Sequence, residues 1–149
     1  MSRKIIRPVQ LHNSGAHGEQ AVRRVAIYVR VSTEEQVEGY SLDAQRRAAR
    51  AYCAERGWQI RVEYVEKGRS ARYEDLSRRP QFKAMLEAAE DHHFDVVLVH
   101  KLDRFARNLL VLLTSLNRLG KANMSFVSVA EQMDYSTPQG RLFLIMLGV

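Results

Sequence analysis

Residues 25–30 read Val-Ala-Ile-Tyr-Val-Arg, a short β-rich run that is typical of a buried parallel strand. A polar stretch with one glycine follows at residues 31–40, which predicts a loop. Ser41 is then placed to cap a helix predicted from Leu42 to about Arg56, and Gly57 is placed to end it. This order of strand, loop and helix recurs along the chain and decides the fold.

The remaining elements follow from the same two periodicities. Alternation of apolar with polar residues predicts a strand over 58–64, and apolar runs predict strands over 95–100 and 124–129. Helical spacing predicts a helix that begins at Pro80, a helix over Asn108–Leu119 that ends at Gly120, and a last helix that begins at Thr137-Pro138. Strands that alternate with helices predict an α/β fold in three layers: a mainly parallel four-stranded sheet with helices on both faces, followed by the start of a long helix.

The composition is that of an ordinary globular domain. The chain has 149 residues, of which 46% are hydrophobic and 27% charged, enough for one domain and hardly for two. Its single cysteine, Cys53, excludes an internal disulfide and a paired-cysteine redox or zinc motif. The longest apolar run, residues 142–149, is far too short to span a membrane, so no membrane partner is expected.

The charge hints at a polyanionic partner. The formal net charge is +6, of which +4 lies in residues 1–24 and +2 in residues 25–149. Arginines outnumber lysines by 18 to 5, and the forked guanidinium suits phosphate groups. A GC-rich genome would give the same bias, so the placement of the arginines carries more weight than their number.

Candidate reactive residues follow the predicted strands, where parallel sheets hold their sites. Arg30 and Ser32 stand two residues apart at the end of the first strand, and Glu66 follows the second. Arg104 and Arg107, three residues apart, share one face of a helical turn after the third strand. A serine that faces arginines and carboxylates suits phosphoryl transfer, because guanidinium groups can neutralise a phosphate without a metal.

Two alternatives stay open on these residues. A metal-dependent nuclease or phosphatase would need clustered carboxylates or histidines, and no strand end carries an HxH, DxD or ExxH pattern. A catalytically inactive DNA-binding or assembly module of the same fold is the other alternative. No glycine-rich nucleotide-binding motif is present, so nucleotide binding has no support.

The motifs taken together resemble the catalytic domain of the serine recombinases, the resolvase and invertase family. The resemblance covers residues 24–149, and residues 39–45 and 79–82 look more like the large, integrase-type members. The matching segments are Tyr28-x-Arg30-Val31-Ser32, Gln36, Gly39-Tyr-Ser-Leu-Asp-Ala-Gln45, Glu66, Gly68, Ser70, Arg79-Pro80, Lys101-Leu-Asp103-Arg104-x-x-Arg107 and Thr137-Pro-Gln-Gly140.

The resemblance implies a recombinase reaction without a metal, nucleotide or other cofactor. Ser32 would attack a scissile DNA phosphodiester and become linked to the 5′ phosphate, which frees a 3′ hydroxyl. Arg30, Arg104 and Arg107 would hold and neutralise the phosphate. Asp103 would orient these groups or handle the proton.

Five further residues are implied as support for the phosphate and the neighbouring loop. Arg79 would assist from the loop, and Gln36, Gln45 and Ser70 would position the loop and the phosphate. Glu66 stands where the family usually has aspartate, and its longer side chain can still reach a neighbouring arginine.

The resemblance also implies partners and a division of the chain. The partners would be double-stranded DNA and a second copy of the chain, in a homodimer that pairs into a synaptic tetramer. The expected location is the bacterial cytoplasm, at the nucleoid, with the protein encoded by the bacterium or by a phage. Residues 1–23 are expected to form a flexible basic arm, 24–136 the catalytic core, and 137–149 the start of a dimerisation helix cut short, with the DNA-binding domain absent. The alternative is that this helix packs on its own sheet.

Overall fold

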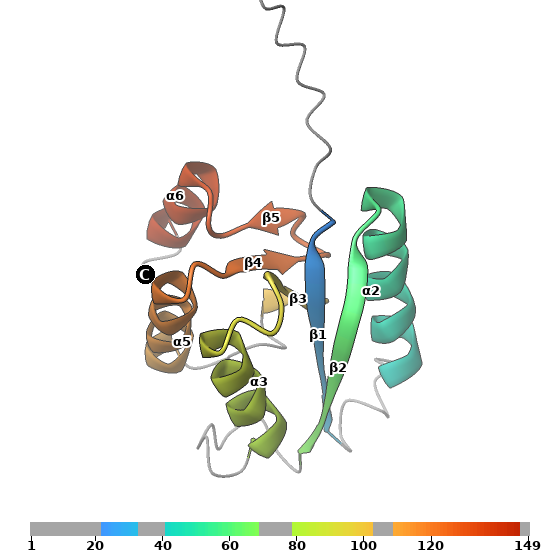
Figure 1. Cartoon of the computed structure of the whole chain (residues 1–149). Coiled ribbons are helices and arrows are strands. Elements are labelled where there is room, and N and C mark those ends of the chain that lie inside the picture. The colour runs from blue at the N-terminus through green and yellow to red at the C-terminus, as the bar shows by residue number, and fades with distance from the viewer. Residues whose placement is uncertain (1–21, 33–40, 69–78, 103–108, 147–149) are drawn as a thin grey trace, which may run out of the picture.

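A five-stranded sheet forms the centre of the part that the computed structural model describes, which is residues 22–32, 41–68, 79–102 and 109–146 (Figure 1). For Ser32, Gly68 and Leu109 the structure describes only the backbone. The strand order is β2-β1-β3-β4-β5. The strands are β1 (Arg24–Ser32), β2 (Gln59–Gly68), β3 (Val96–Val99), β4 (Ser125–Ser128) and β5 (Met133–Asp134).

The predicted mainly parallel sheet is confirmed, with one addition. β1 to β4 are parallel neighbours, whereas β5 pairs antiparallel with β4. β5 has two residues, too few to produce an alternating pattern, so the sequence did not predict it. β2 extends to Gly68, beyond the predicted end at residue 64, which places Glu66 inside the strand.

Helices cover both faces of the sheet, as predicted. α2 (Leu42–Arg56) lies on one face, and α3 (Pro80–Glu90) and α5 (Leu109–Lys121) lie on the other (Figure 1). The alternation along β1 produces this division: Val25, Ile27 and Val29 pack with α2, whereas Ala26 and Tyr28 join the core beneath α3 and α5.

The helix ends follow the predicted signals, with one exception. Ser41 Oγ accepts the Ala44 N–H at 3.1 Å, and Gly57 takes the left-handed conformation that ends α2. Pro80 opens α3, as expected for a residue without an N–H. Gly120 does not end α5, which continues to Lys121; Asn123 adopts the positive φ beyond it instead.

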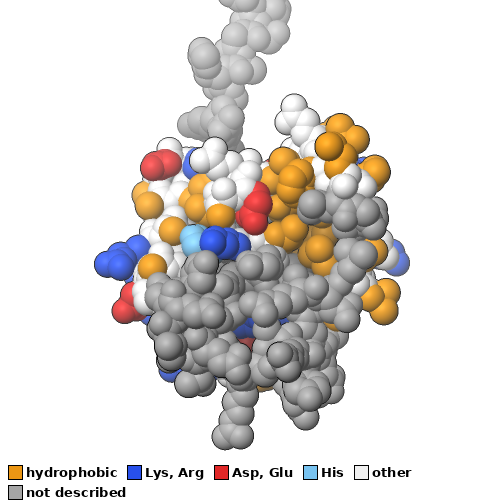
Figure 2. All heavy atoms as spheres, turned by 180° about the vertical axis from the view of Figure 1, so that it is seen from behind, with side chains coloured by type: hydrophobic (Ala, Val, Ile, Leu, Met, Phe, Trp, Pro, Cys, Tyr) orange, Lys and Arg blue, Asp and Glu red, His pale blue; other side chains and the backbone are white. Residues whose placement is uncertain are grey.

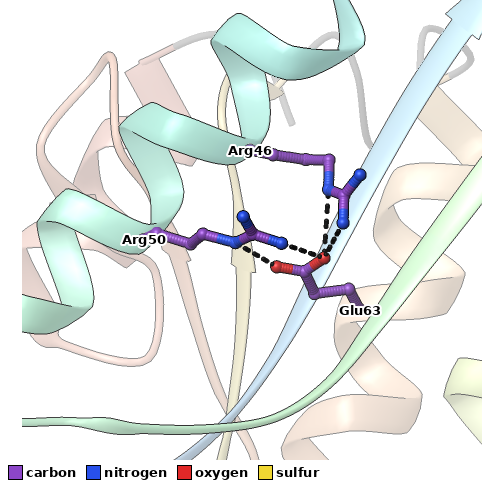
Figure 3. A network of polar contacts seen from close by, with 3 residues as sticks. All are labelled: Arg46, Arg50 and Glu63. Carbon is purple, nitrogen blue, oxygen red and sulfur yellow. Dashed lines mark hydrogen bonds and ion pairs between the residues drawn. The ribbon is translucent and has the colours of Figure 1, made fainter.

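An ion-pair network attaches α2 to β2 (Figure 3). Arg46 and Arg50 converge on the Glu63 carboxylate, with nitrogen–oxygen distances of 2.7–3.0 Å. The Arg50 and Arg46 guanidiniums lower the pKa of Glu63, against the effect of its partial burial. Because the network is partly exposed, it contributes less to stability than the apolar packing beside it.

The last helix packs on the core with one side and leaves the other exposed. α6 (Pro138–Met146) begins after Thr137, whose Oγ1 accepts the Gly140 N–H at 3.1 Å. Leu144 is buried and Phe143 packs against the core, so the helix does pack on its own domain. Apolar side chains gather on one side of this face of the molecule (Figure 2). The exposed large apolar residues of α5 and α6 are Leu110, Leu113, Leu142, Ile145 and Met146.

The arm expected over residues 1–23 lies outside the described residues except for Val22 and Arg23. Among the described helices, none combines the length and apolar character that crossing a membrane requires.

Replacing Gly140 by alanine should lower the free energy of unfolding by about 1–3 kcal/mol. A Cβ at this position would lie 2.1 Å from the Asp134 carbonyl oxygen, so α6 would have to move away from β5. Urea denaturation followed by circular dichroism measures the change.

Gly120→Ala is the matched control for this substitution. An added Cβ at Gly120 meets nothing within 4 Å, and alanine favours the helix by up to about 1 kcal/mol. Equal stability of the two variants would show that the close approach at Gly140 does not matter.

Candidate active site

The sheet order brings three of the predicted strand ends together. β1 lies between β2 and β3, and all three strands run parallel, so their C-terminal ends share one edge of the sheet. Arg30 and Ser32 belong to the end of β1, and Glu66 to the end of β2. Open α/β sheets bind their ligands at such an edge, which makes it the candidate site.

Arg30 and Glu66 are direct cross-strand neighbours. They are paired in register, as are Ser32 and Gly68 two positions further along. Both charged side chains are buried, with exposed fractions of 6% for Arg30 and 3% for Glu66. Buried charged groups are rare and need specific partners, so this pair marks the edge as more than a structural end of the sheet.

Arg79, which directly precedes α3, joins the same cluster. Its Nη2 donates to the Tyr28 hydroxyl at 2.8 Å, and its Nε lies 3.3 Å from the same oxygen. Its guanidinium also stacks 4.1 Å from the centre of the Phe82 ring, and Phe82 packs edge-on against Tyr28. Two aromatic rings therefore fix the position of a buried guanidinium that the family resemblance implies as support for the phosphate.

The Glu66 carboxylate faces the start of α3. Its Oε2 accepts the Phe82 backbone N–H at 2.9 Å, and the Gln81 N–H also bonds to it. Burial raises the pKa of Glu66, and the Phe82 and Gln81 amides with Arg79 and Arg30 oppose that rise. Glu66 thus lies close enough to Arg79 and Arg30 for both guanidiniums to act on its carboxyl.

Tyr28 is a site residue whose role depends on long-range packing. Burial raises the pKa of Tyr28 to about 12, against the effect of Arg79. The hydroxyl therefore stays protonated at neutral pH and accepts from Arg79 through its lone pairs. The position of Tyr28 in an apolar strand predicts a core residue, which is correct. Its hydrogen bond with Arg79 joins residues 51 positions apart, so the local sequence does not indicate it.

Gln45 connects α2 with the end of β1. It is buried, and its Nε2 donates to the Arg30 carbonyl oxygen at 3.2 Å. Within the described part of the chain, its Oε1 is a buried acceptor without a hydrogen-bond donor. Gln45 therefore contacts the backbone of the strand that carries Ser32.

The other candidate residues lie outside the described structure. These are Gln36, Ser70, Asp103, Arg104 and Arg107, together with the side chain of Ser32. His100 and Lys101, at the end of β3, are half-buried at the border of that region. Among the described residues, no three histidine, cysteine, aspartate or glutamate side chains group into a metal site.

A comparison with known protein families identifies the family of this chain. The model of the resolvase N-terminal domain matches residues 25–149, so the chain belongs to this family, as the motifs predicted. The crystal structure of the N-terminal catalytic domain of TP901-1 integrase is similar at 35% identity and a TM-score of 0.73, over 85% of this chain and 92% of that one. This similarity supports the expected resemblance to integrase-type members.

Two further similarities extend the comparison. A resolvase family site-specific recombinase from Streptococcus pneumoniae has 33% identity and a TM-score of 0.70, over 85% of this chain and 83% of that one. A putative DNA recombinase of Bacillus subtilis is 34% identical over 126 residues, which is 83% of this chain. The chain spans 24% of the length of that relative.

Replacing Tyr28 by phenylalanine should destabilise the protein by about 1.5–3 kcal/mol, because a buried charged donor loses its acceptor. The rings of Tyr28 and Phe82 would still pack, so the loss reports the Arg79 hydrogen bond. The free energy of unfolding in urea measures it.

Tyr64→Phe is the control, since Tyr64 pairs with Tyr28 in register on β2. Tyr64 is half-buried against Phe94, and the same substitution there should change stability by less than about 0.5 kcal/mol. Similar losses in both variants would contradict a specific bond between Tyr28 and Arg79.

Proposed function

We propose that this chain is the catalytic domain of a site-specific DNA recombinase with Ser32 as its nucleophile. The observation that carries the proposal is the burial of Arg30, two residues before Ser32, beside Glu66 in a chain of the resolvase family. Placing a guanidinium in such a position costs desolvation energy, which a phosphate ligand would offset.

The reaction would exchange one phosphodiester for another. Ser32 Oγ forms a bond to the scissile phosphorus as the bond from phosphorus to the 3′ oxygen breaks. The serine proton passes to a base, and the departing 3′ oxygen takes up a proton to leave a 3′ hydroxyl. The 5′ phosphoserine linkage conserves the bond energy, so a 3′ hydroxyl can reverse the step and rejoin the DNA.

Arginines would supply the charge stabilisation that this reaction needs. Arg30, Arg104 and Arg107 hold the non-bridging oxygens, and Asp103 orients them or handles a proton. Arg79 assists from the start of α3, where Tyr28 and Phe82 hold its guanidinium. The supporting residues Gln36, Gln45 and Ser70 order the surrounding loops, and no step requires a metal or another cofactor.

Full-length protein incubated with a suicide DNA substrate tests the nucleophile. The wild type should form a covalent protein–DNA adduct in the presence of EDTA, and Ser32→Ala should form none. Ser41→Ala is the control: it removes the N-cap of α2 and costs about 1 kcal/mol of stability, but should still form the adduct.

Three outcomes would contradict the proposal. An adduct that persists in Ser32→Ala would exclude this nucleophile, and loss of the adduct with EDTA would favour the metal-dependent nuclease or phosphatase. DNA binding without any adduct in the wild type would favour the inactive assembly module.

We further propose that the exposed apolar surface of α5 and α6 contacts a second copy, in a dimer that pairs into a tetramer on double-stranded DNA. Leu142, Ile145 and Met146 are 57%, 65% and 78% exposed on α6, and Leu110 and Leu113 are 72% and 38% exposed on α5. Next to them lies a groove of about 460 Å³ whose lining includes Leu113, Leu116 and Leu144. Contiguous apolar surfaces of this kind are typical of protein interfaces.

Replacing Ile145 by glutamate should shift the protein from dimer to monomer in sedimentation velocity, because a charge in an apolar interface is costly. Val22→Glu is the control, since Val22 is 60% exposed outside this surface and should leave the sedimentation coefficient unchanged. A wild type that remains monomeric at the highest accessible concentration would exclude this dimer.

A further inference from the structure

The start of α3 lacks the usual local cap. Arg79 occupies the N-cap position, and its side chain makes no capping hydrogen bond. Serine, threonine, aspartate or asparagine normally accepts the first free N–H groups of a helix from this position. Pro80 has no N–H, which leaves the amides of Gln81 and Phe82 to be bound by another group.

Glu66 provides this cap from a different element. Its carboxylate accepts the N–H groups of Phe82, at 2.9 Å, and of Gln81, across 16 positions of sequence between Glu66 and Phe82. A carboxylate at a helix N-terminus also interacts favourably with the helix dipole. The end of β2 and the start of α3 are therefore joined through one buried side chain.

This cap leaves the side chain of Arg79 available for the site. The guanidinium extends to Tyr28 on β1 and stacks on Phe82, the same residue whose amide bonds to Glu66. Glu66 holds the Phe82 backbone, the Phe82 ring holds the Arg79 guanidinium, and Tyr28 accepts its hydrogen bond. These contacts join β2 to α3 through Glu66 and the start of α3 to β1 through Arg79.

We propose that Glu66 is a positioning residue: by capping α3 from β2, it sets where Arg79 presents its guanidinium at the edge of the sheet. The inference rests on the proposed recombinase function for its consequence, since Arg79 is there a phosphate-binding group. In this role Glu66 acts through Arg79 and not on the reacting atoms themselves.

The cap depends on the ionised carboxylate. Burial raises the pKa of Glu66. Among the described residues, the titratable and charged groups that influence it are Tyr28 and Arg30 of β1 and Arg79 before α3. Protonation would weaken the bonds to the two amides. Acidification should therefore loosen the start of α3 at a pH above the ordinary glutamate range, before exposed carboxylates are protonated.

Three variants separate capping from proton transfer. Glu66→Gln keeps the shape and one acceptor oxygen, Glu66→Ala removes the acceptor, and Glu63→Gln is the control, on the same strand but on the α2 face. In each full-length protein, amide hydrogen exchange at Gln81 and Phe82 is measured by NMR, alongside the rate of adduct formation from pH 5 to pH 8.

We expect exchange at both amides to accelerate by roughly tenfold or more in Glu66→Ala and by less in Glu66→Gln, since a bond to a charged acceptor is the stronger one. The adduct rate should fall in the same order. The wild-type rate should decrease on acidification, and Glu66→Gln should lose this acid-side decrease. Glu63→Gln should match the wild type in both measurements.

Equal loss of adduct in Glu66→Gln and Glu66→Ala with unchanged exchange at both amides would overturn the proposal and assign Glu66 to proton transfer. Wild-type exchange and rate in Glu66→Gln would also overturn it. If Glu66→Ala fails to fold, the isosteric glutamine variant still decides. Failure of the recombinase function is distinguishable, because the wild type would then form no adduct whatever the exchange shows.

Discussion

Complete enclosure of β1 is the constraint on which the rest of the structure depends. The strand pairs along both edges, with β2 and β3, and its side chains from Val25 to Val29 are fully buried. Each face therefore requires its own covering layer, which is why α2 and the α3–α5 layer lie on opposite sides. A strand so enclosed forms a rigid base, and Arg30 and Ser32 continue it directly. Side chains at the end of this strand are therefore held in place by a rigid backbone.

The periodicities that predict the sheet and the helices are local, and this is why they succeed. Four strands and four helices follow from apolar spacing, and the caps at Ser41, Gly57 and Pro80 follow from residue chemistry. The two-residue β5 and the extension of β2 to Gly68 depend on pairing with a neighbour, for which the local sequence holds no signal. Asn123 replaces Gly120 as the left-handed residue because it too tolerates that conformation.

The candidate site shows the same difference between features that the local sequence predicts and features that depend on long-range packing. The spacing of Arg30 and Ser32, and their position at a strand end, can be predicted from the sequence alone. The bond between Arg79 and Tyr28 cannot, because it depends on how α3 is placed over β1 across 51 positions. The capping role of Glu66 is likewise hidden, since α3 begins with an arginine and shows no capping motif. Sequence patterns thus predict that Arg30 and Ser32 lie at a strand end, but they do not predict the long-range contacts that hold Arg79 and Glu66 there.

Two glutamates on β2 have opposite pKa shifts because their surroundings differ. Glu63 and Glu66 lie three residues apart on β2, yet one faces α2 and the other the start of α3. Arginines lower the pKa of Glu63, so its stabilising effect is present at neutral pH and is lost as the pH falls. Burial raises the pKa of Glu66, so the folded state binds its proton more tightly than the unfolded chain. The ionised carboxylate therefore lowers the stability of the whole fold as the pH rises, although it is the form that holds the start of α3 locally. A carboxylate kept where its charge is unfavourable is better explained by what it positions than by stability, because an uncharged side chain would fill the same space at less cost.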